Sequence, residues 1–200
     1  MSIKSITNLS INNDRPWLIL GKGPSFSRIV DINTNSYFTF GLNHVVNHIY
    51  CDMLHIIDLE VFDDIHTIEC TYLIIPWHPH LNNRPTNRDL EDWIDERPYL
   101  KHFERNNRLF TYNLSTWKGE RLSGFPIIET KYFSAEAAFR ILIEAGVKII
   151  YSLGIDGGTK YAEEFDYLKP LTNKRKSFDD QFKEINKIIK KSGITYHALT

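Results

Sequence analysis

The chain has 200 residues, of which 42% are hydrophobic, 13% aromatic and 24% charged. This composition is typical of a globular domain with a sizeable core, and it excludes a disordered chain, a collagen-like repeat and a coiled-coil rod. The 24 Lys and Arg residues face 25 Asp and Glu residues, for a formal net charge of −1, so we expect no nucleic-acid polymer as a partner. The two cysteines, Cys51 and Cys70, are too few for a disulfide framework, and the polar N-terminus has no signal-peptide pattern. We therefore expect one cytoplasmic domain over residues 1–200.

The first half of the chain predicts a series of short strands. Residues 1–13 are polar and are expected to form a loose arm or a short edge element. Apolar segments that each end at glycine, aspartate or proline then follow, which is typical of buried parallel strands. These segments are residues 17–20, 37–40, 54–57 and 72–76. A helix is expected to begin near Phe26, because Pro24 and Ser25 suit a helix start.

The second half predicts an insert followed by more regular elements. Residues 77–107 are rich in Pro, Asn, Arg and Trp, and predict an irregular insert that covers or flanks the site, with one short helix near residues 89–95. Further elements are expected at residues 108–112 (strand), 134–145 (helix), 147–153 (strand), 177–191 (helix) and 194–198 (strand). Ser177 together with Asp180 is expected to cap the last helix. Strands that alternate with helices predict an α/β, Rossmann-like fold, with a mostly parallel sheet flanked by helices.

Polar and glycine-rich turns follow the predicted strands. In a parallel sheet, ligands bind at the carboxyl ends of the strands, near the switch in strand order. The turn after the first strand consists of Gly21, Lys22, Gly23, Pro24 and Ser25. A glycine turn that enters a helix exposes backbone N–H groups, which favours phosphate binding. The alternative is a tight turn that needs glycine for backbone reasons. The spacing of the glycines in residues 21–25 matches neither the dinucleotide fingerprint nor a P-loop.

A second glycine turn, residues 154–158, follows the predicted strand 147–153. Asp156 lies in this turn and is followed by Gly157 and Gly158. A turn of this kind at a strand end is poorly suited to packing alone. Asp156 is therefore the residue that we most expect to bind a ligand.

Two histidines, His78 and His80, follow the predicted strand 72–76 beside Trp77. Either imidazole is suited to act as a general base at neutral pH, and the alternative is a loop histidine packed against Trp77. No third ligand lies at a recognised spacing, so we predict no metal site from this pair. The remaining histidines are interpreted as structural or surface residues: His44, His48, His55, His66, His102 and His197.

An acidic segment follows the predicted strand 54–57. It contains Asp58 and Glu60, with Asp63 and Asp64 just beyond. Carboxylate oxygens suit Mg²⁺, which many enzymes of nucleotide diphosphates need. A solvated helix start is the alternative interpretation.

Four motifs taken together resemble the bacterial sialyltransferases of Campylobacter type and the related archaeal 6-hydroxymethylpterin diphosphokinase-like proteins. They are Leu18 to Ser25, then Phe40-Gly41-Leu42-Asn43, then Lys131-Tyr132-Phe133-Ser134 followed by Gly154-Ile155-Asp156, and finally Tyr161-Ala162 with Phe165-Asp166. The resemblance covers residues 17–60 and 130–200, and it rests on the order and spacing of the motifs.

The resemblance implies a CMP-sugar donor and a role for each matching position. The turn 21–25 would lie against the nucleotide, and Asn43 would face the donor. Ser134 would face the sugar or ribose, while Asp156 would accept hydrogen bonds from a ribose or base. Tyr161 would donate to a phosphate. Asp58 stands where the family has an asparagine near the substrate.

The chain departs from the family at several positions. Lys22 replaces an asparagine, and its charge suits a diphosphate or triphosphate. Gly158 replaces a tyrosine. The family's general-base histidine has no counterpart before the last helix, where Lys174 and Arg175 stand instead; these are expected to stabilise a phosphate leaving group or to lie on a solvated surface.

The expected function is a sialyltransferase-like glycosyltransferase that uses a nucleotide-sugar donor in surface polysaccharide or lipopolysaccharide synthesis. The acceptor is expected to be a glycan or a small molecule, and no cofactor is required. One alternative is a Mg²⁺-dependent diphosphokinase that resembles the pterin enzymes. Another is a non-catalytic nucleotide- or glycan-binding protein. A homo-oligomer and a peripheral membrane contact both stay open.

Overall fold

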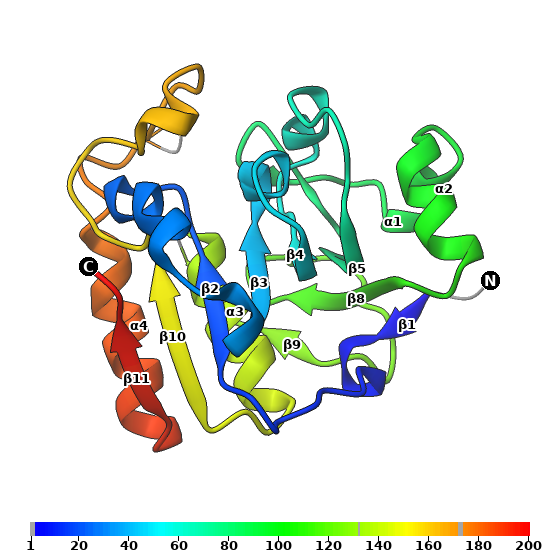
Figure 1. Ribbon diagram of the computed structural model, residues 1–200. Helices are drawn as coiled ribbons and strands as arrows, with labels where there is room; N and C mark the ends of the chain where they lie inside the picture. Colours follow the sequence, from blue (N-terminus) through cyan, green and yellow to red (C-terminus); the bar gives the residue numbers. More distant parts are fainter. Residues whose placement is uncertain (1–2, 132, 172–173) are drawn as a thin grey trace.

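The fold is that of a computed structural model, which describes residues 3–131, 133–171 and 174–200. These residues form an α/β, Rossmann-like fold around a nine-stranded sheet, in which every neighbouring pair of strands is parallel. The main strands are β2 (Trp17–Leu20), β3 (Phe38–Leu42), β4 (Cys51–His55), β5 (Cys70–Pro76), β8 (Leu109–Leu114), β10 (Ile149–Leu153) and β11 (Thr195–Ala198). Their spatial order, with the edge strand β1 (Lys4–Ser5), is β1-β8-β5-β4-β3-β2-β10-β11. Figure 1 shows this row, with β11 at one side and β1 at the other.

The strand order switches between β2 and β10. From β2 the chain adds β3, β4, β5 and β8 on one side, and it later returns to add β10 and β11 on the other side. At such a switch the connections leave toward opposite faces of the sheet, which opens a crevice at the carboxyl ends of the strands. The expected position of a ligand site is therefore beside the ends of β2 and β10.

Both faces of the sheet are covered. On one face, Trp17 and Ile19 pack with the apolar sides of α3 (Ser134–Glu144) and α4 (Asp180–Ser192). On the other face, Leu18 and Leu20 pack in a layer with the 3₁₀ helix Pro24–Asp31 and with α1 (Leu90–Ile94) and α2 (Pro98–Arg105). Successive side chains of a strand point to opposite faces, so the short apolar strand β2 contributes to both core layers.

Several predicted elements differ in detail. β4 covers residues 51–55 instead of 54–57, and the helix expected near Phe26 is a 3₁₀ helix. The N-terminal segment supplies the edge strand β1, followed by the buried Ile6 and Leu9. The insert 77–107 holds the predicted α1 but also α2, which was not predicted, and a hairpin of β6 (His80–Leu81) and β7 (Arg84–Pro85). β9 (Ile127–Ile128) extends β8.

The predicted cap of the last helix is wrong. Asp179 occupies the N-cap position of α4, and the Ser177 hydroxyl accepts a hydrogen bond from the Asp179 backbone N–H at 3.0 Å. The segment 177–179 is held by the glycine turn after β10, as described below. Among the described residues, no helix combines the length and the apolar character needed to cross a membrane.

Candidate functional site

A cavity of about 450 Å³ lies at the switch between β2 and β10. Its walls come from the ends of several strands, from the hairpin β6–β7, from the start of α3 and from the start of α4. They include Gly21, Lys22, Gly23, Asn43, His44, Asp58, Glu60, Asp64, Asn82, Asn83, Phe133, Ser134, Asp156, Gly157, Tyr161, Lys169, Phe178 and Gln181. The volume falls within the range of small-molecule sites in proteins. In Figure 1 the segment between β10 and α4 lies beyond the carboxyl end of β10.

Two glycines form the floor of the cavity. The Gly21 N–H donates to the Leu153 carbonyl oxygen at 2.8 Å. A Cβ atom on Gly21 would lie 2.4 Å from the Gly154 carbonyl oxygen, and one on Gly154 would lie 2.3 Å from the Gly21 carbonyl oxygen. Gly154 also has a φ of +72°, which favours glycine. The ends of β2 and β10 therefore approach each other too closely for any side chain.

Two backbone N–H groups of the turn after β2, those of Gly23 and Ser25, bind the segment after β10. The Gly23 N–H donates to the Gly154 carbonyl oxygen at 2.7 Å, and the Ser25 N–H donates to Asp156 Oδ2 at 2.7 Å. Ser25 Oγ accepts from the Gly154 N–H at 2.8 Å. Pro24 and Ser25 are absent from the cavity lining. The turn is thus joined to the end of β10 by hydrogen bonds, and Lys22 is its main polar group in the cavity.

Asp156 both holds this turn and lines the cavity. The two glycines after Asp156 differ in their position relative to the cavity. Gly157 lines the cavity, whereas Gly158 is outside the lining and is tied to the start of α4. Its carbonyl oxygen accepts from the Phe178 N–H at 2.7 Å, and its N–H donates to Asp179 Oδ1 at 3.1 Å. The turn 156–158 thereby places the start of α4 beside the cavity.

Lys22 is the central cation of the site. Its Nζ lies 3.3 Å from His44 Nδ1 and 4.4 Å from the centroid of the Tyr161 ring. Burial lowers the pKa of Lys22 to about 8, although Asp58 and Asp64 act in the opposite direction. Lys22 therefore carries its charge at neutral pH and loses it only slightly above.

His44 is part of this wall, a position that its interpretation as a structural or surface residue did not foresee. His44 is only 6% exposed. Burial, together with the positive charge of Lys22, lowers the pKa of the His44 imidazole to about 3. The imidazole is therefore neutral, and Nδ1 accepts the hydrogen bond from Lys22. Nε2 lies 3.7 Å from Asp64 Oδ2. The sequence feature that could have indicated this position is that His44 directly follows Asn43 at the end of a strand.

Asn43, Ser134 and Tyr161, to which the resemblance gave roles in donor binding, all line the cavity. Asn43 Nδ2 donates to Ser134 Oγ at 3.4 Å. Asn43 Oδ1 is buried and has no hydrogen-bond partner within the described part of the chain, so it can accept from a ligand. Burial raises the pKa of Tyr161 to about 12, which keeps its hydroxyl protonated.

His78, which the sequence analysis offered as a general base, lies outside the lining of this cavity. The residue is 8% exposed, and its ring stacks on Trp117 with 4.2 Å between centroids. Its two ring nitrogens lie 3.3 Å and 3.2 Å from the carbonyl oxygens of Arg88 and Glu120. His78 is thus packed in a loop between aromatic rings, and the Trp77 ring contacts it edge-on.

His80 is also absent from the lining, but it lies behind a residue that is present there. Its Nδ1 is 3.5 Å from Asp58 Oδ1, and a β-bridge links the two residues. Asp58 faces the cavity. Asp58 is therefore one of the carboxylates of the cavity wall, with the His80 imidazole next to it.

The basic pair before α4 does not line the cavity. Lys174 is exposed, and Arg175 lies 3.7 Å from Asp180 in an ion pair. Lys169, which sequence reasoning missed, supplies a second lysine to the cavity wall instead. Tyr132, which belongs to the third motif of the resemblance, lies outside the described residues.

The acidic residues after β4 are divided between different partners. Asp63 pairs with Arg97 at 3.4 Å, and Glu60 accepts a hydrogen bond from the Asn82 backbone N–H. Over the described ranges, no three His, Cys, Asp or Glu side chains are grouped so as to hold a metal ion.

Comparison of the chain with protein-family models, with curated proteins and with solved structures gives no match. The site is therefore described by its own geometry. It is a cavity at the strand switch, lined by Lys22, by Asp58 with His80 3.5 Å away, and by Asn43, whose Oδ1 has no hydrogen-bond partner among the described residues.

Proposed function

We propose that the protein is a transferase that binds a nucleotide-sugar donor in the cavity at the β2–β10 switch. One observation carries this proposal. Lys22, Asn43, Ser134, Asp156 and Tyr161 come from separate turns and helix starts, and all of them line this one cavity. Such a set supplies a cation, neutral hydrogen-bonding groups and a carboxylate, which are the groups that bind a phosphate and a ribose.

Each group has a distinct task in this proposal. The Lys22 ammonium and the Tyr161 hydroxyl bind the phosphate, because both present donors and Lys22 Nζ lies over the Tyr161 ring. Asp156 binds the ribose hydroxyls through Oδ1, since Oδ2 already accepts from the Ser25 N–H. Asn43 Oδ1 accepts from a hydroxyl of the sugar.

Asp58 is the general base of the proposed reaction. Its carboxylate takes the proton of the acceptor hydroxyl, and the acceptor oxygen forms a bond to the anomeric carbon. The bond from that carbon to the phosphate oxygen breaks, and the nucleotide leaves with the electron pair. Lys22 stabilises the negative charge on the leaving phosphate. His80 keeps Asp58 in place from behind, at 3.5 Å.

A Mg²⁺-dependent diphosphokinase is the second candidate. The observation in its favour is that Asp58, Glu60 and Asp64 line the same cavity as Lys22. Carboxylates and phosphate oxygens together suit Mg²⁺, and the lysine suits a polyphosphate.

A thermal-shift screen separates these functions, because a ligand that binds the native state raises its apparent stability. The screen uses CMP, UMP, the corresponding nucleotide sugars, and ATP with either Mg²⁺ or EDTA. We expect the nucleotide sugars to raise the melting temperature of the wild type and to be hydrolysed or transferred slowly, with no effect of EDTA. Stabilisation by ATP only with Mg²⁺ would favour the diphosphokinase. Stabilisation by nucleotide sugars without turnover would leave a binding protein.

A further inference from the structure

Three aromatic rings form a continuous wall along the cavity. The rings of Tyr161 and Phe178 stack, with 5.3 Å between centroids and 30° between planes. The Phe133 ring lies against Phe178 at 5.8 Å and 55°. All three residues line the cavity, and Lys22 lies over Tyr161 at one end of the row. The wall therefore leads from the cation to the start of α3.

Gln181 adds a polar group to this wall. It is in the first turn of α4, where its N–H donates to the Phe178 carbonyl oxygen at 3.2 Å. The residue lines the cavity and is only 6% exposed. Within residues 3–131, 133–171 and 174–200, no group hydrogen-bonds to its side-chain amide. Because Gln181 lines the cavity, its amide can pair with a ligand that offers both a donor and an acceptor.

The aromatic wall lies close to the groups proposed for the phosphate and the ribose. Lys22 is at the phosphate end, and Asp156 follows at the position proposed for the ribose. The turn after Asp156 lies directly against the start of α4, because a Cβ on Gly157 would be 2.9 Å from the Phe182 ring. The start of α4, which carries Phe178 and Gln181, is therefore next to the turn of Asp156, and Phe178 is also joined to Lys22 through the Tyr161 ring.

We infer that Phe133, Phe178 and Gln181 form the subsite for the nucleobase of the donor. The base stacks on the Phe178 ring, as bases do on aromatic side chains, and its hydrogen-bonding edge pairs with the Gln181 amide. This inference rests on the proposed function, but it concerns recognition of the base and not the transfer step.

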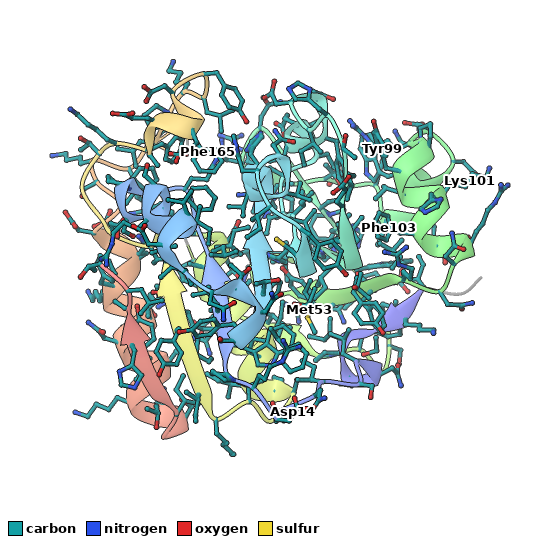
Figure 2. All side chains as sticks on the ribbon, viewed as in Figure 1. Asp14, Met53, Tyr99, Lys101, Phe103 and Phe165 are labelled. Atoms are coloured by element: carbon teal, nitrogen blue, oxygen red, sulfur yellow. The ribbon has the colours of Figure 1, made fainter. Side chains whose placement is uncertain are left out.

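The test compares ligands with and without a base. Calorimetric titrations measure the binding of CMP, UMP, AMP and ribose 5-phosphate to the wild type, to Phe178→Ala and to Gln181→Ala. Phe178→Leu keeps the apolar contact but removes the ring. The matched control is Tyr99→Ala, which removes an exposed ring on α2. Figure 2 shows Tyr99 at the far side of the molecule from Phe165, and Phe165 contacts Phe26 just after the turn 21–25.

We expect Phe178→Ala to weaken the tightest-binding nucleotide about 5- to 150-fold, the usual effect of losing a base–aromatic stack. Phe178→Leu should lose most of the same affinity. Gln181→Ala should weaken that nucleotide about 2- to 10-fold and change its preference over the other bases. Ribose 5-phosphate should bind all of these variants as it binds the wild type, and Tyr99→Ala should change nothing.

Two results would overturn the subsite in different ways. If Phe178→Ala and Gln181→Ala bind nucleotides as the wild type does, or lose ribose 5-phosphate equally, the base does not occupy this wall and the proposed function stands. If the wild type binds none of the nucleotides, the proposed function fails and the base subsite fails with it. Circular dichroism confirms that each variant is folded before its affinity is interpreted.

Discussion

Replacing Lys22 by methionine should stabilise the protein while abolishing phosphate binding. The lowering of the Lys22 pKa from 10.5 to about 8 by burial corresponds to about 3 kcal/mol of unfavourable free energy for the charged form. The variant also loses the hydrogen bond between Lys22 Nζ and His44 Nδ1, which contributes about 1 kcal/mol. The net gain expected at pH 7 is therefore about 2 kcal/mol. For a chain of this size, that raises the melting temperature by about 4–8 °C.

The pH dependence of this gain follows from the direction of the shift. Below pH 8 the lysine is charged in both the folded and the unfolded chain, so the wild type bears the full cost of the buried charge. Between pH 8 and 10.5 the unfolded chain keeps a proton that the folded chain has lost. The free energy of unfolding of the wild type therefore rises with pH relative to the variant by about 3 kcal/mol up to pH 10.5. This exceeds the gain at pH 7, so the variant should be the less stable protein near pH 10.5, by the roughly 1 kcal/mol of the lost hydrogen bond.

Urea denaturation of both proteins between pH 7 and 10, followed by circular dichroism, measures this difference. The matched control is Lys169→Met, which removes a positive charge from the same cavity at an exposed position. Its effect should stay within about 0.5 kcal/mol. A Lys22→Met variant that is no more stable than the wild type at pH 7, or a difference that does not change with pH, would refute the reasoning.

Three further substitutions test the assignments made at the site. Asp58→Asn should lower the rate of transfer about 10²- to 10⁴-fold, with nucleotide affinity nearly unchanged in equilibrium titrations; a full rate would rule Asp58 out as the base. Asp156→Ala should weaken nucleotide binding by about 1.5–3 kcal/mol and also destabilise the fold by about 1 kcal/mol, because the Ser25 N–H loses its acceptor. Unchanged affinity in the folded variant would contradict the ribose role. His78→Ala should reduce the urea midpoint but leave the initial rate of transfer intact, and a selective loss of rate would restore this histidine to catalysis.

Much of the fold could be predicted because the apolar strands end at turn residues. The boundary of β4 could not, since Asp52 interrupts the apolar pattern. In the structure Asp52 is part of the strand because its carboxylate accepts hydrogen bonds from the Thr39 N–H and hydroxyl. The helix α2 was missed because only Leu100 and Phe103 of its eight residues are buried, too few to produce a clear periodic pattern.

The strand-end rule located part of the site, namely Gly21, Lys22, Asn43 and Asp156. The helix residues Phe178 and Gln181 could not be found this way. They reach the cavity only because the Gly158 carbonyl oxygen binds the start of α4, and this contact joins segments with no common sequence signal. The stacking of His78 on Trp117 could not be predicted for a related reason, since Trp117 is distant in the chain.

The contact between Gly21 and Gly154 has a consequence for how this protein could acquire a new ligand. Neither position accepts a side chain, so the depth of the cavity is set by backbone alone and is closed to gradual change by substitution. The hairpin β6–β7 and the segment between β10 and α4, by contrast, line the cavity with side chains from loops, which tolerate insertions and replacements. Selection for a different substrate, in evolution or in the laboratory, should therefore yield changes in these two segments around an invariant pair of glycines. A library randomised at Asn82, Asn83, Lys169 and Leu171 would sample the part of the wall that is free to vary.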